Sequence, residues 1–280
     1  MRVGVMVPMS LSDGSGRMPS WEDVRAFAAH AEDAGLDAVW VCDHFLSGGP
    51  GLPPEGIHEG WTILSALAAS TSRVELGQLV MCVSFRNPAL LAKMAVTADD
   101  VSGGRVLLGL GAGWYDPEYE AFGYPTDHRV GRLEEALQII CPLLRGEAVT
   151  FAGRYHDVHD GALLPSPARR IPVLVAGDGE RMLRLTARYA DAWNTAWFRE
   201  PTDRLRDLLG KLDAALDAEQ RGAQTIRRTV GMEVDAARTA HELGRALAAF
   251  AALGFDDVIV GLEPRTRQSL DRLAEARQLL

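Results

Sequence analysis

Short apolar segments with strand character alternate with amphipathic helical segments along the whole chain, and this alternation restricts the possible folds most. We expect strands at residues 3–8, 37–44, 73–83, 106–110, 171–176, 191–196, 228–234 and 256–262. We expect helices at residues 21–34, 60–71, 87–101, 127–145, 179–189 and 201–222, then one that ends at 253 and one after 265. Strands that alternate with helices form a parallel sheet, and eight such units in 280 residues predict an α/β fold, a single (β/α)8 TIM barrel. A doubly wound open sheet has the same alternation and is the alternative.

The alternation is interrupted at residues 149–165. Period-two patterns around Ala152-Gly153 predict a small β-hairpin, inserted after the fourth strand–helix unit. The helix before it contains Pro142, which we expect to end or kink the last helical turn. Because no linker or shift in composition divides the chain, we expect residues 1–280 to form one domain.

Composition and charge argue against several classes of protein. No run of 18 apolar residues is present, and the first ten residues have the pattern of a strand and not of a signal peptide, so we expect no membrane association. The net charge is −9 with dispersed basic residues, which argues against a nucleic-acid partner. The cysteines Cys42, Cys82 and Cys141 lie far apart in apolar segments and predict reduced core residues of a cytoplasmic protein.

A metal site is considered for one short segment. His156 and His159, each followed by an aspartate, lie in the predicted hairpin. No further cluster of ligand-type side chains follows them, and alternation in a hairpin favours an exposed polar strand. We therefore expect no metal.

A glycine-rich segment follows the fourth strand. The strand at 106–110 is apolar, as expected when both faces are buried, and it runs into the segment 109–113, which has almost no side-chain volume. Such backbone at the carboxyl end of a buried strand makes room for a flat or large group, with Trp114 and Tyr115 at its rim. A glycine-rich turn without a ligand is the simpler interpretation.

Two further strand ends carry polar residues that a barrel would bring to its mouth. Asp43 and His44 end the second strand, and a histidine there is able to give or take a proton near neutral pH, although a capping or surface role is common. The segment 176–181 joins the fifth strand to a helix. Its glycines expose backbone N–H groups, the helix N-terminus is partly positive and Arg181 adds a charge, so it predicts a phosphate site, with a simple tight turn as the alternative.

Four segments resemble one known family. They are SFRNPALLAKMAVTADDVSGGR, GRVLLGLGAGWYDPEYEAFGYP, RLEEALQIICPLLRGEAVTFAGRYHDV and PVLVAGDGERMLRLTARYADAWN. In this order they resemble the bacterial luciferase-like family of flavin and deazaflavin oxidoreductases. The resemblance covers nearly the whole chain and implies a (β/α)8 barrel, in agreement with the alternation.

The resemblance also implies roles for particular residues. His44 matches the proton donor or acceptor, and Asp43 a contact to the cofactor ring. Leu79 and Val80 match a non-proline cis peptide that supports the ring. The other residues expected to bind the cofactor are Cys82, Ala112, Gly113, Trp114, Ala176, Gly177, Asp178, Gly179, Glu180 and Arg181. Trp114 occupies the place of a glutamate found in the family's sugar-phosphate dehydrogenases, which argues against that reaction.

We therefore expect an oxidoreductase that transfers a hydride between deazaflavin coenzyme F420 and a small organic substrate. An FMN-dependent monooxygenase and a catalytically silent flavin-binding barrel are the alternatives. Arg73 and Arg86, which flank the third strand, are candidates for binding the acidic cofactor tail. The expected substrate pocket is mostly aromatic and suits a planar or apolar molecule; its residues are Trp21, His58, Trp61, Trp114 and Trp197. The family also suggests a homodimer.

Overall fold

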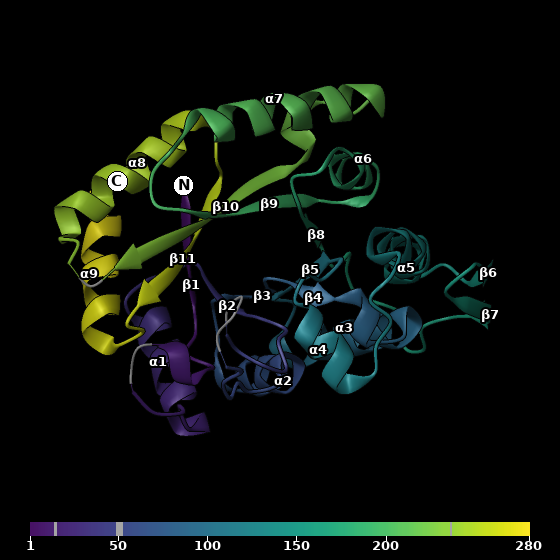
Figure 1. Cartoon of the computed structure of the whole chain (residues 1–280), viewed down its shortest axis with the longest axis horizontal. Helices are drawn as coiled ribbons and strands as arrows, with labels where there is room; N and C mark the ends of the chain where they lie inside the picture. Colours follow the sequence, from purple (N-terminus) through teal and green to yellow (C-terminus); the bar gives the residue numbers. More distant parts are fainter. Residues whose placement is uncertain (14–15, 49–52, 236) are drawn as a thin grey trace.

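The computed structural model describes residues 1–13, 16–48, 53–235 and 237–280. Its main sheet is a closed barrel of parallel strands (Figure 1). The strands are β1 (Arg2–Met6), β2 (Ala38–Val41), β3 (Glu75–Gln78), β4 (Met81–Cys82), β5 (Val106–Gly111), β8 (Val173–Ala176), β9 (Ala192–Phe198), β10 (Arg227–Asp235) and β11 (Asp257–Glu263). β1 pairs with β11, and β3 pairs with β5, so the sheet has no open edge. This confirms the barrel and excludes the open sheet.

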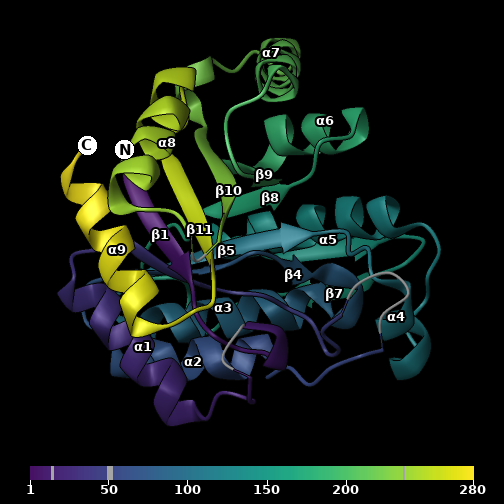
Figure 2. The same cartoon turned by 60° about the vertical axis from the view of Figure 1, so that its left-hand side comes forward.

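The helices surround the barrel (Figures 1 and 2). They are α1 (Trp21–Asp33), α2 (Gly60–Ser70), α3 (Pro88–Ser102), α4 (Asp116–Phe122), α5 (Arg129–Leu144), α6 (Glu180–Tyr189), α7 (Asp203–Ala218), α8 (Ala240–Leu253) and α9 (Arg267–Gln278). Short 3-10 turns lie at Leu11–Asp13, Val83–Phe85 and Ala223–Thr225. Several helix ends have clear local causes: Asn87 accepts a hydrogen bond from the Leu90 N–H ahead of Pro88, and Gly254 ends α8 with a positive φ. No helix in the described ranges is long and apolar enough to cross a membrane.

Three local expectations have specific outcomes. The third strand is not continuous, because it is divided into β3 and β4 at Leu79–Val80. The inserted hairpin is confirmed: β6 (Val149–Ala152) and β7 (Asp157–Gly161) form an antiparallel pair that lies apart from the barrel in Figure 1. α5 ends shortly after Pro142, at Leu144, which agrees with a proline in the last turn. The short helix α4 was not expected from the sequence.

Within the described part of the chain, side chains fill the interior of the barrel. Trp40 is fully buried there and packs over Gly77, where an added Cβ would lie 2.3 Å from the indole ring. At the amino ends of the strands, Arg227 pairs with Glu75 at 2.6 Å and with Asp257, and so closes that end with paired charges. The space for a functional site is therefore at the carboxyl ends.

Candidate active site

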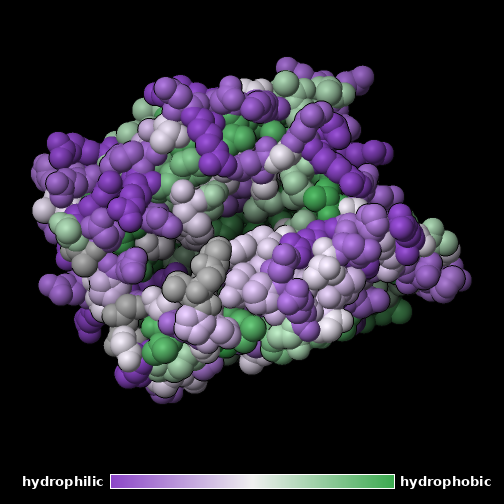
Figure 3. Space-filling model, in the orientation of Figure 1, coloured by the Kyte–Doolittle hydropathy of each residue, from purple (hydrophilic) through white to green (hydrophobic). Residues whose placement is uncertain are grey.

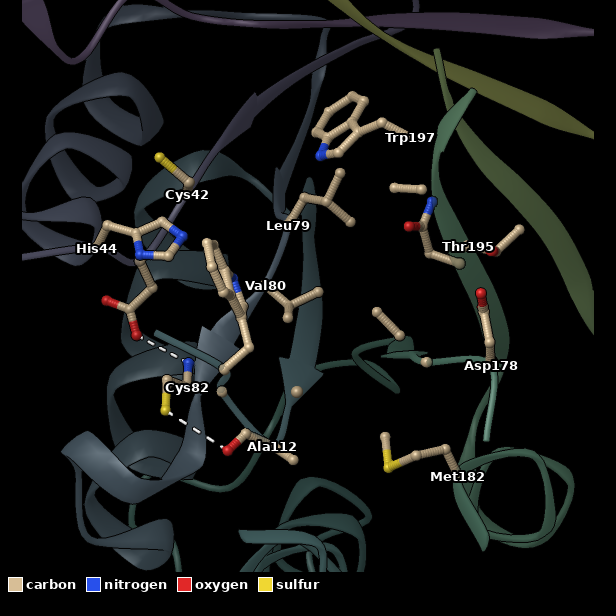
Figure 4. Close-up of a pocket in the computed structure, with 18 of the residues that line it drawn as sticks. Cys42, His44, Leu79, Val80, Cys82, Ala112, Asp178, Met182, Thr195 and Trp197 are labelled. Carbon is tan, nitrogen blue, oxygen red and sulfur yellow. Dashed lines mark hydrogen bonds between the residues drawn. The ribbon is translucent and has the colours of Figure 1, made fainter. Parts of the chain in front are cut away.

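A cavity of about 650 Å³ lies at the carboxyl ends of the strands. Figure 3 shows it as a hollow in the middle of the molecule, with apolar atoms in its depth and a mostly hydrophilic rim. In Figure 4, His44 lies on one side of it, Asp178 and Met182 lie on the opposite side, and Leu79 and Val80 lie between them. A volume of this size is typical of sites for cofactors and small organic ligands.

Eleven of the residues that the sequence predicted for the site line this cavity. They are Asp43, His44, Leu79, Val80, Cys82, Ala112, Gly113, Trp114, Ala176, Gly177 and Asp178. The remaining three, Gly179, Glu180 and Arg181, lie at the start of α6 and are not part of the wall. Arg181 instead pairs with Glu134 of α5 at 2.5 Å. The cofactor roles of all fourteen residues stay predictions.

The structure shows a packing reason for the glycines at 109 and 111, in addition to the expected room for a ligand. An added Cβ at Gly111 would lie 2.4 Å from Cγ2 of Val80, and one at Gly109 would lie 1.9 Å from the carbonyl oxygen of Gln78. These glycines therefore first of all allow the chain at Leu79–Val80 to pack closely against β5. The Leu79–Val80 peptide is cis, as the family resemblance implied, and Ala196–Trp197 is a second non-proline cis peptide that the sequence did not indicate.

His44 is paired with a buried carboxylate. Nδ1 of its ring lies 3.0 Å from Oε2 of Glu118, which is 1% exposed and belongs to α4. The Glu118 carboxylate also accepts the backbone N–H of Phe45 at 2.6 Å and of Leu46 at 3.0 Å. Figure 4 shows the other ring nitrogen of His44, Nε2, directed into the cavity. This arrangement presents one ring nitrogen to a ligand and holds the other from behind.

Asp43 takes part in a buried ion pair. Its carboxylate accepts hydrogen bonds from Nη1 and Nη2 of Arg86, at 2.6 and 2.9 Å, and from the Cys82 N–H at 2.9 Å. Arg86 also pairs with Glu59. Burial raises the pKa of the Asp43 carboxyl, and the guanidinium of Arg86 opposes that rise. Asp43 thus lines the cavity with its oxygens already bonded to protein.

This pairing corrects the expectation for the two arginines that flank the third strand. Arg86 is mostly buried and bonded to carboxylates, so it is not placed for an acidic cofactor tail. Arg73 precedes β3 at the amino end of the barrel, where its backbone N–H bonds Glu32 at the end of α1. It lies at the end opposite to the cavity.

Cys82 and Tyr119 form the floor beneath the glycine-rich segment. The Tyr119 hydroxyl donates to the carbonyl of Ala112 at 2.9 Å, and it lies 3.0 Å from Sγ of Cys82. Burial raises the pKa of the Cys82 thiol and of the Tyr119 hydroxyl, so both stay protonated at neutral pH. Desolvation likewise raises the pKa of the neighbouring, half-buried Cys42 to about 12. Neither cysteine has the lowered pKa of a reactive thiolate.

Two of the predicted aromatic residues border the cavity and three do not. Trp114 and Trp197 line it and are 59% and 40% exposed. Trp61 is instead buried in the core beneath α2, Trp21 begins α1, and Nε2 of His58 bonds the carbonyl of Pro19. Those three were wrong as cavity residues because Trp21 and Trp61 lie in the first turns of helices that pack outside the barrel and His58 lies in the loop before α2.

Several lining residues were missed from the sequence, among them Glu118, Tyr119 and Met182. Glu118 had a usable signal: Asp116-Pro117 begins a helix directly after a strand end, and Glu118 lies in its first turn. The others have no sequence signal that separates them from ordinary core residues.

Fold and site together define a parallel (β/α)8 barrel with a cofactor-sized cavity, where such barrels carry their active sites. The chain belongs to the family described as luciferase-like monooxygenase, which matches residues 1–278. The resemblance found in the sequence is thereby confirmed.

Named relatives show what this chain is similar to. An F420-dependent glucose-6-phosphate dehydrogenase of Kineococcus radiotolerans is 34% identical over 213 residues, which are 74% of this chain and 62% of that protein. One of Amycolatopsis mediterranei is 34% identical over 61% of this chain and 52% of its own length. The phthiodiolone/phenolphthiodiolone dimycocerosates ketoreductase of Mycobacterium tuberculosis is 34% identical over 72% of this chain and 58% of its length. The matches thus span less than two thirds of these relatives.

Solved structures show the same fold. An F420-dependent secondary alcohol dehydrogenase has a TM-score of 0.84 at 17% identity, over 99% of this chain and 98% of that one. The coenzyme F420-dependent tetrahydromethanopterin reductase of Methanopyrus kandleri has a TM-score of 0.79 at 14% identity, over 98% and 97%. Monooxygenase RslO1 of Streptomyces bottropensis also has 0.79, at 18% identity, over 98% and 96%. At these identities the likeness concerns the fold alone.

Proposed function

We propose that this protein is an F420-dependent oxidoreductase that transfers a hydride between the deazaflavin and a small apolar alcohol or ketone. The observation that carries the proposal is the His44–Glu118 pair, whose ring nitrogen Nε2 is directed into a cavity of cofactor size. The relatives that bear F420 and ketoreductase in their names support the cofactor and the type of substrate. An oxidoreductase of this kind needs one proton for each hydride, and His44 is placed to exchange it.

The residues present fit an elongated cofactor with a flat ring and a phosphate. Val80 and the backbone of Gly111–Gly113 would support the ring, because they form a wall with little side-chain volume. The start of α6 would hold the phosphate. Gly179 is its N-cap and makes no side-chain cap hydrogen bond, and nothing described lies within 4 Å of a Cβ added at this residue. Backbone N–H groups in such a position bind anions well.

The chemistry divides between the cofactor and the protein. When bound, the deazaflavin takes up or supplies the hydride. In the direction of alcohol oxidation, Nε2 of His44 takes the proton from the hydroxyl oxygen while the carbon that bears this hydroxyl gives up a hydride, and the product is a ketone. Glu118 stabilises the imidazolium that results. In the reverse direction, the protonated His44 gives the proton back to the developing alkoxide.

The lining of the cavity favours an uncharged substrate over a sugar phosphate. Among the lining residues of the described chain, Arg265 is the one with a permanent positive charge, and it pairs with Asp13. Asp178, on the wall opposite His44, pairs with Arg204 at 2.8 Å. No unpaired cation of the described wall would therefore receive a substrate phosphate, whereas Trp114 and Trp197 offer apolar surface.

The test is a titration of the purified chain with oxidised and reduced F420 and with FMN, followed by turnover assays without oxygen. We expect F420 binding, reduction of F420 by small secondary alcohols, and little activity with glucose 6-phosphate. Binding of FMN alone with oxygen-dependent turnover would support a monooxygenase instead. Cofactor binding without any turnover across alcohols and ketones would support a silent binding protein.

A further inference from the structure

The buried carboxylate of Glu118 lies beside Nδ1 of His44. We propose that Glu118 is a positioning residue that keeps the proton of neutral His44 on Nδ1, and so leaves Nε2 as the acceptor that faces the substrate. This inference rests on the proposed function for its catalytic meaning. The contacts from which it is argued lie between residues of the protein and do not involve the cofactor.

The surroundings of Glu118 suit a carboxylate that only accepts hydrogen bonds. Its side chain is 2% exposed, and its oxygens lie within hydrogen-bond distance of two backbone donors, the N–H groups of Phe45 and Leu46, and of Nδ1 of His44. An ionised carboxylate accepts hydrogen bonds at both oxygens and donates none. Because backbone N–H groups are always donors, they hold Oε1 in place whether or not His44 changes its state.

The tautomer of neutral His44 follows from its contact with Glu118. Oε2 of Glu118 lies 3.0 Å from Nδ1, and an ionised carboxylate next to a ring nitrogen requires that nitrogen to be the N–H donor. In neutral imidazole the other nitrogen is then an acceptor. Nε2, which points into the cavity in Figure 4, is therefore ready to take a proton from a bound alcohol.

A positioning role for Glu118 requires that α4 is held firmly against the barrel. The Phe45 ring stacks on Phe85 with centroids 4.6 Å apart, and Phe85 contacts Tyr119 of α4 at 5.0 Å. The Tyr119 hydroxyl is bonded to Ala112 at the end of β5. The His44 ring itself is flanked by Trp114, whose ring is nearly perpendicular at 5.8 Å. These contacts hold both members of the pair against the barrel.

Neither of the other carboxylates in the described wall is placed to do this. The Asp43 carboxylate accepts hydrogen bonds from Arg86 and Cys82. Asp178 lies on the opposite side of the cavity from His44 and accepts a hydrogen bond from Arg204. Glu118 also lies close in sequence to Trp114, the position at which the family's sugar-phosphate dehydrogenases carry a glutamate. The carboxylate on this side of the cavity is therefore that of Glu118 in α4, which contacts Nδ1 of His44.

The test is the substitution Glu118→Gln, which keeps the volume of the side chain. Phe45 and Leu46 will hold the amide oxygen of the glutamine at the position of Oε1. The amide nitrogen will then take the place of Oε2, 3.0 Å from Nδ1, where its N–H opposes a proton on Nδ1 although the oxygen at the Oε1 position lies 3.1 Å away; we therefore expect the proton of neutral His44 to shift towards Nε2. Glu120→Gln, on the exposed side of the same helix, is the matched control.

The first readout is the 15N NMR spectrum of the histidine rings in the full chain without cofactor, with the His44 signals identified by their loss in His44→Gln. We expect the Nδ1–H tautomer in the wild type and in Glu120→Gln, and the Nε2–H tautomer in Glu118→Gln. The same tautomer in all three proteins, or an Nε2–H wild type, would overturn the inference. This readout does not depend on any enzymatic activity.

The second readout is turnover with F420. In Glu118→Gln we expect kcat for alcohol oxidation to fall by a factor of about 10² or more with KM little changed, because the base is lost and the binding surface is kept. Unchanged kcat together with an inverted tautomer would overturn the positioning role. If the wild type shows no turnover, the proposed function fails, and the NMR spectra alone then decide the inference. Melting curves show whether each variant is folded.

Discussion

Nδ1 of His44 lies 3.0 Å from Oε2 of Glu118, although the two residues are separated by 74 positions in the chain. His44 follows β2 and Glu118 lies in α4, which follows β5. The closed barrel brings the ends of these strands to the same rim, and the pair forms there. A histidine that is held in this way from behind is suited to exchange protons with a ligand in front of it.

Removal of the imidazole tests its role in proton transfer. We expect His44→Ala to lower kcat by a factor of about 10²–10⁴ while cofactor affinity stays nearly unchanged, because the ring is one small part of the cavity wall. Steady-state kinetics and cofactor titration measure the two effects. His241→Ala, on the exposed surface of α8, is the control. Near-native turnover in His44→Ala would reduce His44 to a wall of the cavity.

The proposed phosphate site is tested at Gly179. Gly179→Val places a branched side chain at the start of α6, where φ is −69° and nothing described lies within 4 Å of the added Cβ. We expect a folded protein with at least tenfold weaker cofactor binding, about 1.4 kcal/mol or more. Gly210→Ala in α7, also without neighbours within 4 Å of its Cβ, is the control. A folded Gly179→Val variant that binds the cofactor normally would remove the assignment.

The Asp43–Arg86 pair is expected to stabilise the fold and not to bind the cofactor tail. Arg86→Met leaves the buried Asp43 carboxylate without its cation, so we expect the free energy of unfolding to fall by about 3–5 kcal/mol. Urea denaturation measures this change. Arg73→Met, on the exposed side before β3, is expected to cost no more than about 0.5 kcal/mol. Equal stability of the two variants would contradict this account of Arg86.

The link between α1 and β3 is expected to depend on pH. The Glu32 carboxylate accepts the N–H groups of Ser72, Arg73 and Val74. Partial burial raises the pKa of this carboxyl, but the three donors outweigh burial and hold the pKa below its ordinary value of 4.5. A carboxyl whose pKa is lowered on folding contributes stability above its unfolded pKa and loses it as the pH falls through the folded value.

Wild type is therefore expected to melt at a higher temperature than Glu32→Gln at neutral pH, and the difference is expected to vanish well below pH 4.5. Melting curves between neutral pH and about pH 3 measure it. Asp33→Asn removes a charge from the next, exposed residue and is the control. A difference between wild type and Glu32→Gln that persists or grows in acid would contradict the assigned hydrogen bonds.

Much of the fold was accessible from the sequence because the signals are local. Period and length separate strands such as β5 from helices such as α5, and the order of the elements limits the topology to few choices. The capping residues Asn87 and Gly254 act within one turn of chain. Most of the candidate site followed too, because a barrel places the carboxyl ends of all its strands at one rim.

The tertiary structure decided what each residue at that rim contacts. Sequence reasoning offered Arg86 to a cofactor tail, whereas the fold pairs it with the buried carboxylate of Asp43. It also related the glycines at residues 109–113 to a ligand, and the fold adds that Gln78 and Val80 fill the space beside Gly109 and Gly111 of β5.

The sequence by itself determined a barrel of eight strand–helix units with His44 at its mouth, because burial and helical period are properties of neighbouring residues. Only the tertiary structure decided that Glu118 lies behind His44 and that Trp61 faces the core. Such contacts depend on the register between strands and on the direction in which each side chain leaves its backbone. Neither quantity is contained in any single segment of the chain.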